Sequence, residues 1–294
     1  MQEVITRQNL NVSEKIRWAK ERIKEWYEAW DGQVYVSFSG GKDSTMLLHL
    51  VRLLYPEVPG VFVNTGLEFP EVTQFVRTTP NVTWLRPSKS FKEVVDYYGF
   101  PVVSKEVAMA ISRCRNTKSE VQKGLRLRGG INPSTGRKQT AGVIPQKYHY
   151  LLNAPFKISE QCCTVMKKQP LKKYYRETGR VPYVGVMATD SRSRLRSYAE
   201  AGCNIFDRQL AMSRPLSIWR EEDIWRCLRA GIPYSSIYDK GYDRTGCVFC
   251  MFGCQQEADP RFVRLKKTHP RLHEYCMGSL GLREVLNFMN VPTE

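Results

Sequence analysis

Apolar residues recur at helical spacing near the start of the chain, in residues 13–30. They fall three or four positions apart, at Ile16, Ala19, Ile23 and Trp26. This is the spacing of one face of an α-helix. Ser13 stands before the first of them, and serine is a preferred N-cap residue. The pattern predicts an amphipathic helix that begins at Ser13 and ends at the Asp31-Gly32 turn.

Short β-branched and aromatic runs follow, separated by helical patterns. The runs typical of buried strands lie at 33–38, 60–65, 82–87 and 181–188. The helical patterns lie at 45–55, 91–98 and 221–231. Strands that alternate with helices favour a parallel sheet with helices on both faces, so we expect an α/β fold.

Composition narrows the class of protein. The chain has 294 residues, of which 42% are hydrophobic, so it can form a core and a mainly disordered protein is excluded. No stretch approaches the 18–20 or so apolar residues of a membrane span, and the first residues lack the apolar segment of a signal peptide. We therefore expect a cytoplasmic protein whose nine cysteines are reduced. The net charge of +16 favours a polyanionic partner or a phosphate-rich substrate.

Six residues between the first strand and the next helix have the features of a phosphate-binding loop. They are Ser39, Gly40, Gly41, Lys42, Asp43 and Ser44. Glycines let the backbone approach an anion, and the helix N-terminus adds N–H donors and partial positive charge. Lys42 would add a full charge, and the two serines offer hydroxyl groups. The residues do not have the spacing of a Walker A loop.

Two regions interrupt the alternation of strands and helices. Residues 105–147 carry ten Lys and Arg against two Asp and Glu, a net charge of +8, and 126–142 within them resembles a loop in composition. The tail from Gly241 holds four of the nine cysteines. We therefore expect three parts: an N-terminal helix (1–31), a nucleotide-binding domain with a basic insert (32–240), and a C-terminal segment (241–294). The insert either binds nucleic acid, covers the nucleotide phosphates, or is a solvated basic loop.

Four cysteines form two paired motifs. Cys162 and Cys163 are adjacent, and Cys247 and Cys250 form a C-x-x-C motif after 83 intervening residues. Four thiolates in a reducing compartment can bind zinc or an iron–sulfur cluster, and the spacing alone leaves both open. The single cysteines Cys114, Cys203 and Cys227 have the pattern of buried free thiols.

The segment 36–50, VSFSGGKDSTMLLHL, resembles the PP-loop of the N-type ATP pyrophosphatases. Within that superfamily, residues 33–250 resemble the phosphoadenosine-phosphosulfate reductase family. The further matching segments are 63–72, 185–197 and 214–250. The resemblance implies a Rossmann-like domain with the nucleotide at the carboxyl ends of the strands. It places nucleotide contacts at Thr65, Gly66 and Glu68, and makes Glu68 and Asp43 candidates for Mg²⁺ and ribose contacts.

The segment 185–197 is similar to the arginine-rich substrate segment of that family. Its arginines are Arg192, Arg194 and Arg196. Alternate residues of an extended segment share one face, so we expect the three to converge on a sulfate or phosphate, which arginine binds in a bidentate manner. Arg192 and Arg194 would act with Lys42 in catalysis, and Arg196 would contact the nucleotide.

The segment 162–171, CCTVMKKQPL, is similar to the cluster-binding segment of the adenylyl-sulfate reductases. That resemblance favours a [4Fe–4S] cluster on Cys162, Cys163, Cys247 and Cys250. Lys168 matches a lysine beside the cluster in those enzymes, and Lys167 stands where they have arginine.

Two departures from the reductases bear on the reaction. Those enzymes carry a sulfur-accepting cysteine in a short C-terminal Glu-Cys-Gly segment, whereas this sequence ends VLNFMNVPTE. Cys254 is the better substitute and Cys276 the other candidate, because a sulfur acceptor must be an exposed thiolate near positive charge. Many reductases also carry a degenerate PP-loop, whereas SGGKDS is intact here.

Three functions are consistent with these features. The first is ATP-dependent sulfur transfer to an acceptor, with release of AMP and pyrophosphate. The second is reduction of adenylyl sulfate or its 3′-phosphorylated form. The third is a non-catalytic subunit of a nucleic-acid machine such as a mobile-element or antiviral system. We expect ATP or adenylyl sulfate, Mg²⁺ and a [4Fe–4S] cluster as ligands. We also expect a sulfur donor or reductant protein as a partner, and a homo-oligomer.

Overall fold

The computed structural model describes residues 2–139, 141–207 and 211–294. Within these ranges the chain forms two compact units. The first, which we call the sheet unit, comprises residues up to 64, 68–86 and 170–245. The second, the cysteine unit, comprises 65–67, 87–169 and 246–294. The basic region 105–147, which we expected within the nucleotide-binding domain, belongs to the cysteine unit together with the C-terminal residues.

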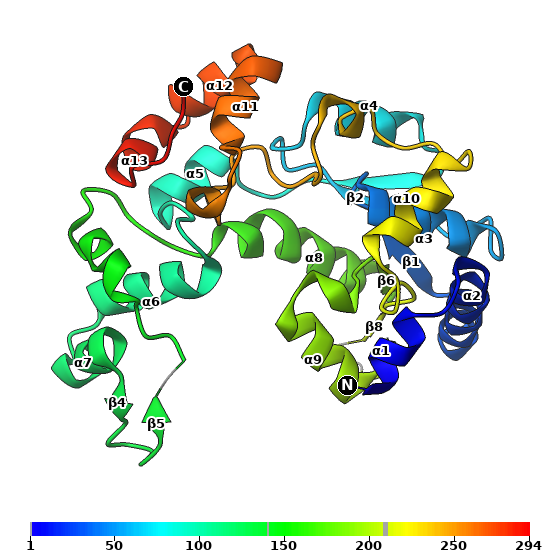
Figure 1. Ribbon diagram of the computed structural model, residues 1–294, viewed down its shortest axis with the longest axis horizontal. Coiled ribbons are helices and arrows are strands. Elements are labelled where there is room, and N and C mark those ends of the chain that lie inside the picture. The colour runs from blue at the N-terminus through cyan, green and yellow to red at the C-terminus, as the bar shows by residue number, and fades with distance from the viewer. Residues whose placement is uncertain (1, 140, 208–210) are drawn as a thin grey trace. The chain divides into compact units, whose positions relative to one another are not determined.

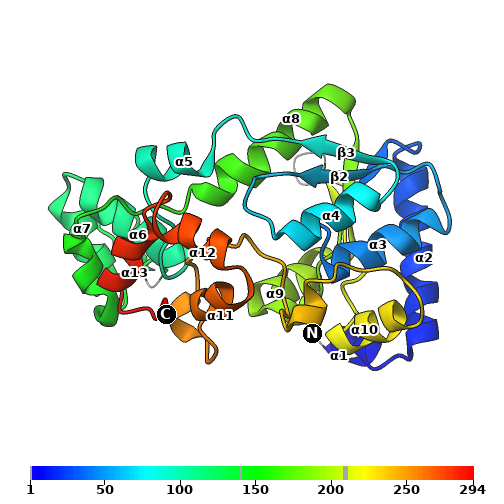
Figure 2. The same ribbon diagram turned by 90° about the horizontal axis from the view of Figure 1, so that it is seen from above.

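The sheet unit is built on a six-stranded sheet, shown in Figures 1 and 2, with the order β3-β2-β1-β6-β8-β7. Its strands are β1 (Val34–Ser37), β2 (Gly60–Val63), β3 (Val82–Leu85), β6 (Val181–Val184), β7 (Asn204–Ile205) and β8 (Met212–Ser213). All neighbouring pairs are parallel except β7 and β8. The four long strands are those expected from the sequence, which confirms the α/β fold with a parallel sheet.

Helices cover both faces of this sheet. Those of the sheet unit are α1 (Gln2–Gln8), α2 (Val12–Ala29), α3 (Lys42–Arg52), α4 (Pro70–Thr78), α9 (Arg192–Ala201) and α10 (Glu221–Arg229), and α8 (Gln169–Thr178) enters it from Pro170. Val34 and Val36 face a core that contains residues of α2, α3 and α10. Tyr35 points to the other face, where its ring lies 5.2 Å from that of Tyr174 on α8. This alternation follows from the period of two in a strand.

The N-cap of helix α2 lies two residues earlier than we expected. Asn11, not Ser13, is its N-cap: the Asn11 side chain accepts from Glu14 N–H, and the Glu14 carboxylate accepts from Asn11 N–H. Such a reciprocal capping box satisfies two helix-end donors at once. The buried face contains Ala19, Ile23 and Trp26, as the spacing predicted.

The cysteine unit is mainly helical. Its helices are α5 (Phe91–Tyr97), α6 (Lys105–Asn116), α7 (Glu120–Arg128), α11 (Arg261–Thr268), α12 (Pro270–Met277) and α13 (Leu282–Phe288). The segment 126–142, which we expected to be a loop, contains the end of α7 and a small hairpin of β4 (Gly130–Ile131) and β5 (Lys138–Gln139). Short-range hydrogen bonds close its turn, from the N–H groups of Thr135 and Gly136 to Asn132 O. In the described part of the chain, no helix has the length and apolar character needed to cross a membrane.

Candidate nucleotide site and cysteine cluster

The loop 39–44 lies where β1 ends and α3 begins. Gly40 has φ +71°, and a Cβ there would lie 2.7 Å from a Val76 methyl carbon, so the close packing of the loop on α4 requires glycine. Gly41 is the N-cap of α3 and provides no capping side chain. The cap itself therefore leaves the first N–H groups of α3 to acceptors from elsewhere, which is the arrangement of an anion site.

The two serines of the loop hold its shape. Ser39 Oγ and Ser44 Oγ lie 3.0 Å apart, and Ser39 N–H donates to Ser44 Oγ at 3.1 Å. Ser44 Oγ also donates to Gly41 O at 2.9 Å, as does Thr45 Oγ1. These hydroxyls, which we expected to face a ligand, are used within the loop itself.

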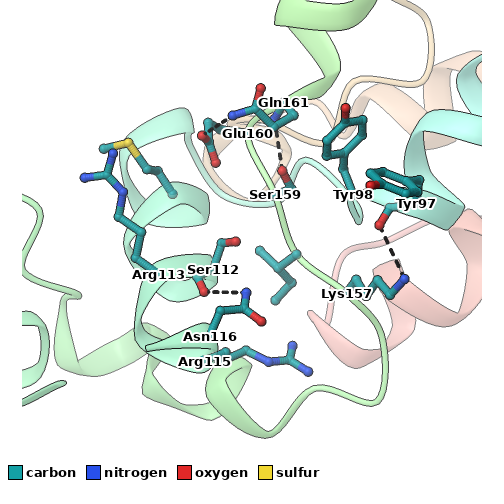
Figure 3. A pocket seen from close by; sticks show the side chains of 12 residues that line it. Tyr97, Tyr98, Ser112, Arg113, Arg115, Asn116, Lys157, Ser159, Glu160 and Gln161 are labelled. Atoms are coloured by element: carbon teal, nitrogen blue, oxygen red, sulfur yellow. Dashed lines mark hydrogen bonds between the residues drawn. The ribbon is translucent and has the colours of Figure 1, made fainter. Parts of the chain in front are cut away.

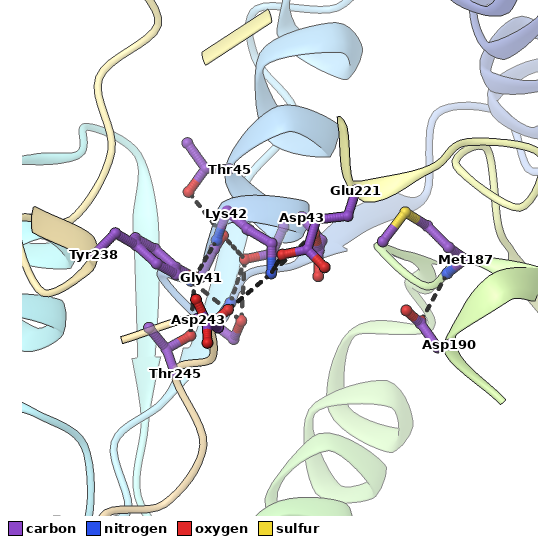
Figure 4. A network of polar contacts seen from close by, with 12 residues as sticks. Gly41, Lys42, Asp43, Thr45, Met187, Asp190, Glu221, Tyr238, Asp243 and Thr245 are labelled. Carbon is purple, nitrogen blue, oxygen red and sulfur yellow. Dashed lines mark hydrogen bonds and ion pairs between the residues drawn. The ribbon is translucent and has the colours of Figure 1, made fainter. Parts of the chain in front are cut away.

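A segment near the end of the sheet unit, residues 238–245, covers the loop. Lys42 N–H donates to the Tyr238 phenol oxygen at 2.7 Å, and Lys42 Nζ donates to Asp243 O at 3.0 Å. A Cβ at Gly41 would lie 2.5 Å from Thr245 Oγ1. Figure 4 shows Tyr238, Asp243 and Thr245 gathered at the start of α3. The covering segment therefore occupies the donors that a phosphate would use.

Two carboxylates lie beside the buried Lys42. Its Nζ is 3.2 Å from Glu221 Oε1 and 4.0 Å from Asp43 Oδ1. Asp43 Oδ1 is buried and has no hydrogen-bond partner among the described residues. Burial raises the pKa of Asp43, while Lys42 lowers it and Asp190 and Glu221 raise it. An unsatisfied carboxylate oxygen in an acidic surrounding is a suitable ligand for a hard cation such as Mg²⁺.

The three arginines do not converge as we expected. Residues 192–201 form helix α9, not an extended segment, so Arg194 points to a different side from Arg192 and Arg196, which are four residues apart and share one face. Arg194 pairs with Asp190, whose carboxylate also accepts from Met187 N–H at 3.0 Å. Arg192 and Arg196 are exposed, and neither side chain makes an ion pair or hydrogen bond with a described residue. The extended conformation that the clamp assumed is wrong, because Ser191 caps a helix here: its hydroxyl accepts from Arg194 N–H. The role of the three arginines in binding an anion stays a prediction.

The remaining expected nucleotide contacts follow β2. Thr65 is buried and its Oγ1 accepts from Leu67 N–H at 3.2 Å, while Glu68 is half-buried. Thr65 and Gly66 belong to the cysteine unit, and Glu68 to the sheet unit. Their role in binding a nucleotide stays a prediction.

Cys162, Cys163, Cys247 and Cys250 all lie in the cysteine unit. Burial raises the pKa of Cys162, and the neighbouring thiols of Cys247, Cys163 and Cys250 raise it further. The two motifs, far apart in the sequence, are therefore brought within electrostatic range of one another. Lys167 lowers the pKa of Cys162 and of Cys250, so a cation also lies near the thiols. We conclude that these residues fit a group that binds several thiolates.

Among the residues that the structure describes, no three His, Cys, Asp or Glu side chains are placed to hold one ion. Tetrahedral zinc would need sulfurs about 3.8 Å apart, given Zn–S bonds of about 2.3 Å. A cubane cluster binds each sulfur through a separate iron and so accepts a wider spacing.

Cys254 is a buried thiol. Its side chain is 3% exposed, and its Sγ donates to Met251 O at 3.1 Å. Burial raises its pKa to about 12, although Arg261 lowers it. Arg261 provides the positive charge that we expected near a sulfur acceptor. Cys254 is not exposed in this structure, however, whereas a sulfur acceptor must be. Cys276 is buried as well, as are Cys114, Cys203 and Cys227, which we expected to be buried free thiols.

Sequence analysis missed Glu221, Tyr238 and Asp243 at the loop. They lie about 180–200 residues from Lys42, and no local motif connects them with it. The only signal was their position in 214–250, a segment that resembles the family. That resemblance alone did not indicate a role for any of these three residues.

Comparison with known proteins agrees with this picture. The model of the phosphoadenosine phosphosulfate reductase domain matches residues 33–101 and 88–252. The chain therefore belongs to this family of enzymes.

Two curated relatives illustrate the similarity. An uncharacterized protein of Methanocaldococcus jannaschii is 25% identical over 255 residues, which cover 85% of this chain and 49% of the relative. This chain thus spans about half the length of that relative. The adenosine 5′-phosphosulfate reductase of Staphylococcus epidermidis is 23% identical over 274 residues, which cover 90% of each chain.

Among solved structures, the phosphoadenylyl-sulfate reductase of Candida auris in its phosphate complex is similar, with a TM-score of 0.46 and 14% identity. The match covers 78% of this chain and 87% of that one.

Proposed function

We propose that this protein splits ATP into AMP and pyrophosphate in order to transfer sulfur to an acceptor. The observation that supports the proposal is a buried cation, Lys42, beside an unsatisfied carboxylate oxygen, Asp43 Oδ1, at the N-terminus of α3. A triphosphate with Mg²⁺ needs both kinds of group: a cation for its oxygens and a carboxylate for the metal.

In the nucleotide-bound state, phosphate oxygens would replace the Tyr238 phenol and the Asp243 carbonyl as acceptors for Lys42. The first N–H groups of α3 would donate to the same anion. Asp43 and Glu221 would hold Mg²⁺, which usually takes one or two carboxylates together with phosphate oxygens. The reaction therefore begins with displacement of the covering segment 238–245.

The proposed chemistry has two balanced steps. An oxygen of the acceptor attacks the α-phosphorus, and the bond to the bridging oxygen breaks, so that pyrophosphate leaves with the electron pair. A sulfide-level nucleophile then attacks the acceptor carbon, and the acceptor oxygen leaves on AMP. The nucleophile gives up its proton, and no atom changes its total oxidation state. A [4Fe–4S] cluster on Cys162, Cys163, Cys247 and Cys250 would supply iron that binds sulfide-level sulfur.

Reduction of adenylyl sulfate is the second candidate. It is supported by the Staphylococcus epidermidis reductase, which aligns over 90% of both chains. In that reaction a thiolate attacks the sulfate sulfur and AMP leaves, and a second thiol then releases sulfite and leaves a disulfide. Helix α9 turns Arg194 away from Arg192 and Arg196 and pairs it with Asp190, which argues against a sulfate clamp made by all three arginines.

The two reactions differ in their substrates and products. Anaerobic protein supplied with ATP, Mg²⁺ and sulfide should hydrolyse or transfer adenylate with release of AMP and pyrophosphate. With adenylyl sulfate and a dithiol it should release no sulfite. Sulfite release without pyrophosphate formation from ATP would replace the first function with the second. Formation of ADP from ATP would contradict both.

Replacement of Lys42 tests the location of the nucleotide. Lys42→Met should weaken ATP binding by about 10- to 100-fold, since a charge-assisted hydrogen bond contributes about 1.5–3 kcal/mol. Adenosine binding should change little, because adenosine has no phosphate. Lys24→Met, at an exposed lysine of the same unit, is the matched control. An equal loss of affinity for ATP and for adenosine would contradict the placement of the ATP phosphates at this loop.

A further inference from the structure

The cysteine unit contains a cavity of about 480 Å³ that none of the features above explains. Its walls are the end of α5, one side of α6 and the segment 157–161, which leads directly to Cys162. This volume lies within the range of about 300–1,000 Å³ typical of small-ligand sites. Figure 3 shows Tyr97 and Tyr98 on one side of the cavity and Ser112 and Arg113 on the other.

Two cations of the cavity hold its walls together. Lys157 Nζ donates to Asp96 O at 3.1 Å and to Tyr97 O at 3.3 Å, at the end of α5. Arg115 donates to Phe156 O at 2.8 Å and to Ala154 O at 3.1 Å. Cations at the C-terminus of a helix stabilise its last carbonyl groups. These two residues therefore shape the cavity.

Other polar groups of the cavity are available to a ligand. The hydroxyl groups of Tyr98 and Ser112 and the guanidinium of Arg113 form no hydrogen bond or ion pair with a residue that the structure describes. Asn116 donates to Ser112 O at 2.8 Å, which leaves its amide oxygen as an acceptor. The cavity thus presents both donors and acceptors, as the edge of a nucleobase requires.

An exposed aromatic ring lies at the mouth of the cavity. Tyr97 is 66% exposed, and its ring centroid is 4.6 Å from that of Tyr98. Lys89 Nζ lies 5.3 Å from the centre of the Tyr97 ring. A tyrosine that keeps an open face next to a lysine can stack on a base while the cation meets the adjoining phosphate.

The charge of the unit fits the same ligand. The cysteine unit contains 21 Lys and Arg against 10 Asp and Glu, a net charge of +11, whereas the sheet unit has 24 against 19, a net charge of +5. Much of the excess lies on α6, α7 and the β4–β5 hairpin, which neighbour one another in Figures 1 and 2. The side chains of Lys105, Lys118, Arg128, Arg137 and Lys138 are exposed and make no ion pair or hydrogen bond within the described ranges.

We propose that this cavity binds an unpaired nucleotide of a single-stranded nucleic acid, whose backbone follows the basic surface of α6, α7 and the hairpin. The base would stack on Tyr97 and meet Ser112 and Asn116, and Arg113 would neutralise a phosphate. A duplex base is already stacked on both faces, so only an unpaired one can enter. The inference extends the proposed function by naming the class of acceptor.

Fluorescence anisotropy with labelled oligonucleotides of about twelve nucleotides tests the proposal, because single-strand sites span about 4–16 nucleotides. Single-stranded RNA, single-stranded DNA and duplex DNA are the three probes, without ATP. Either single strand should bind at least about tenfold more tightly than the duplex. Preference for RNA would indicate contact with the 2′-hydroxyl, and equal binding would indicate recognition of base and phosphate alone.

Variants locate the site. Tyr97→Ala should weaken single-strand binding about tenfold or more, whereas Tyr97→Phe should retain it, since stacking needs only the ring. Arg113→Ala should weaken binding and lower the slope of log K against log salt by about 0.7, the value for one phosphate of a single strand. The matched controls Tyr175→Ala and Arg271→Ala, at exposed residues outside the cavity, should bind as the parent does.

Several results would overturn the inference: no oligonucleotide binding, equal binding of duplex and single strand, or unchanged binding by Tyr97→Ala. Because Tyr97 is exposed, unfolding is not expected in that variant, and its thermal midpoint checks this. Pyrophosphate release is measured separately. Pyrophosphate release without oligonucleotide binding would reject only the cavity, and the reverse would reject only the proposed ATP reaction.

Discussion

The backbone N–H of Lys42 donates a 2.7 Å hydrogen bond to the phenol oxygen of Tyr238, a residue 196 positions further along the chain. The same lysine donates from its ammonium to Asp243 O, and a Cβ at Gly41 would lie 2.5 Å from Thr245 Oγ1, two residues further along the chain. The donors of the phosphate loop are thus satisfied from within the chain. A nucleotide must therefore compete with the covering segment 238–245 for the same hydrogen bonds.

This competition predicts that Tyr238→Phe binds ATP more tightly than the parent. Without the phenol oxygen, Lys42 N–H has no internal acceptor, and a phosphate oxygen gains the bond without displacing one. A neutral hydrogen bond contributes about 0.5–1.5 kcal/mol, so the affinity should rise about 2- to 12-fold. Isothermal titration calorimetry with ATP and with adenosine measures the effect, which should be confined to ATP.

The control for this variant is Tyr27→Phe, which removes a phenol that bonds to Glu57 in the same unit, outside the covering segment. Its affinity for ATP should equal that of the parent. Weaker ATP binding by Tyr238→Phe would mean that the phenol belongs to the nucleotide site and does not compete with it.

The cysteine set predicts an iron–sulfur protein. Anaerobically purified protein should be brown and contain about four irons and four sulfides per chain. Cys162→Ser and Cys247→Ser should lose both and should lower the thermal midpoint of the cysteine unit, since ligand binding is coupled to folding. Cys114→Ser, at a buried thiol of the same unit, should keep the full content. Stoichiometric zinc without iron would contradict the prediction.

A buried ion pair between α2 and α10 predicts an asymmetric response to mutation. Lys15 is 1% exposed, and its Nζ lies 2.6 Å from Asp223 Oδ2, which also accepts from Arg220 N–H. Asp223→Ala leaves a buried cation without its partner and should lower the free energy of unfolding by about 3–5 kcal/mol. The double variant Lys15→Met with Asp223→Ala should recover part of that loss. Chemical denaturation measures both, and a larger loss in the double variant would refute the explanation.

Acid should destabilise the helices α11–α13 through His273. Burial lowers the pKa of His273, and Lys266 and Arg283 lower it further, although the bond to Thr293 O, 2.9 Å from Nε2, raises it. The unfolded chain therefore takes up a proton near pH 6.5, before the folded chain does. Stability is fully present above about pH 6.5 and falls as the pH drops toward the folded pKa, by up to about 1.4 kcal/mol per pH unit.

His273→Gln tests this assignment because glutamine can donate to Thr293 O but does not titrate. Its free energy of unfolding should depend less on pH between 6.5 and 5 than that of the parent. His49, whose pKa burial also lowers, remains in both proteins and contributes the same slope to each. If the free energy of unfolding depends on pH identically in the parent and in His273→Gln, His273 is not the group responsible.

Much of the sheet unit could be predicted from the sequence because its determinants are local. The apolar runs at β1, β2, β3 and β6 are short and rich in β-branched and aromatic residues, and this composition identifies them as strands. The loop 39–44 was recognisable for the same reason: its glycines, lysine and serines are consecutive, and a strand and a helix flank them. The paired cysteines were likewise visible as two local motifs.

The tertiary structure decided what depends on residues distant in sequence. Tyr238 and Asp243 reach Lys42 only because the chain returns to the end of β1, and no local period records that return. The same holds for the cavity, whose walls come from α5, α6 and residues 157–161. Arg192, Arg194 and Arg196 show the converse: alternation in the sequence fits an extended segment, but the segment is a helix capped by Ser191, which turns Arg194 away from the other two. Hydrophobic period and loop composition are properties of neighbours along the chain, whereas a binding site is a property of neighbours in space.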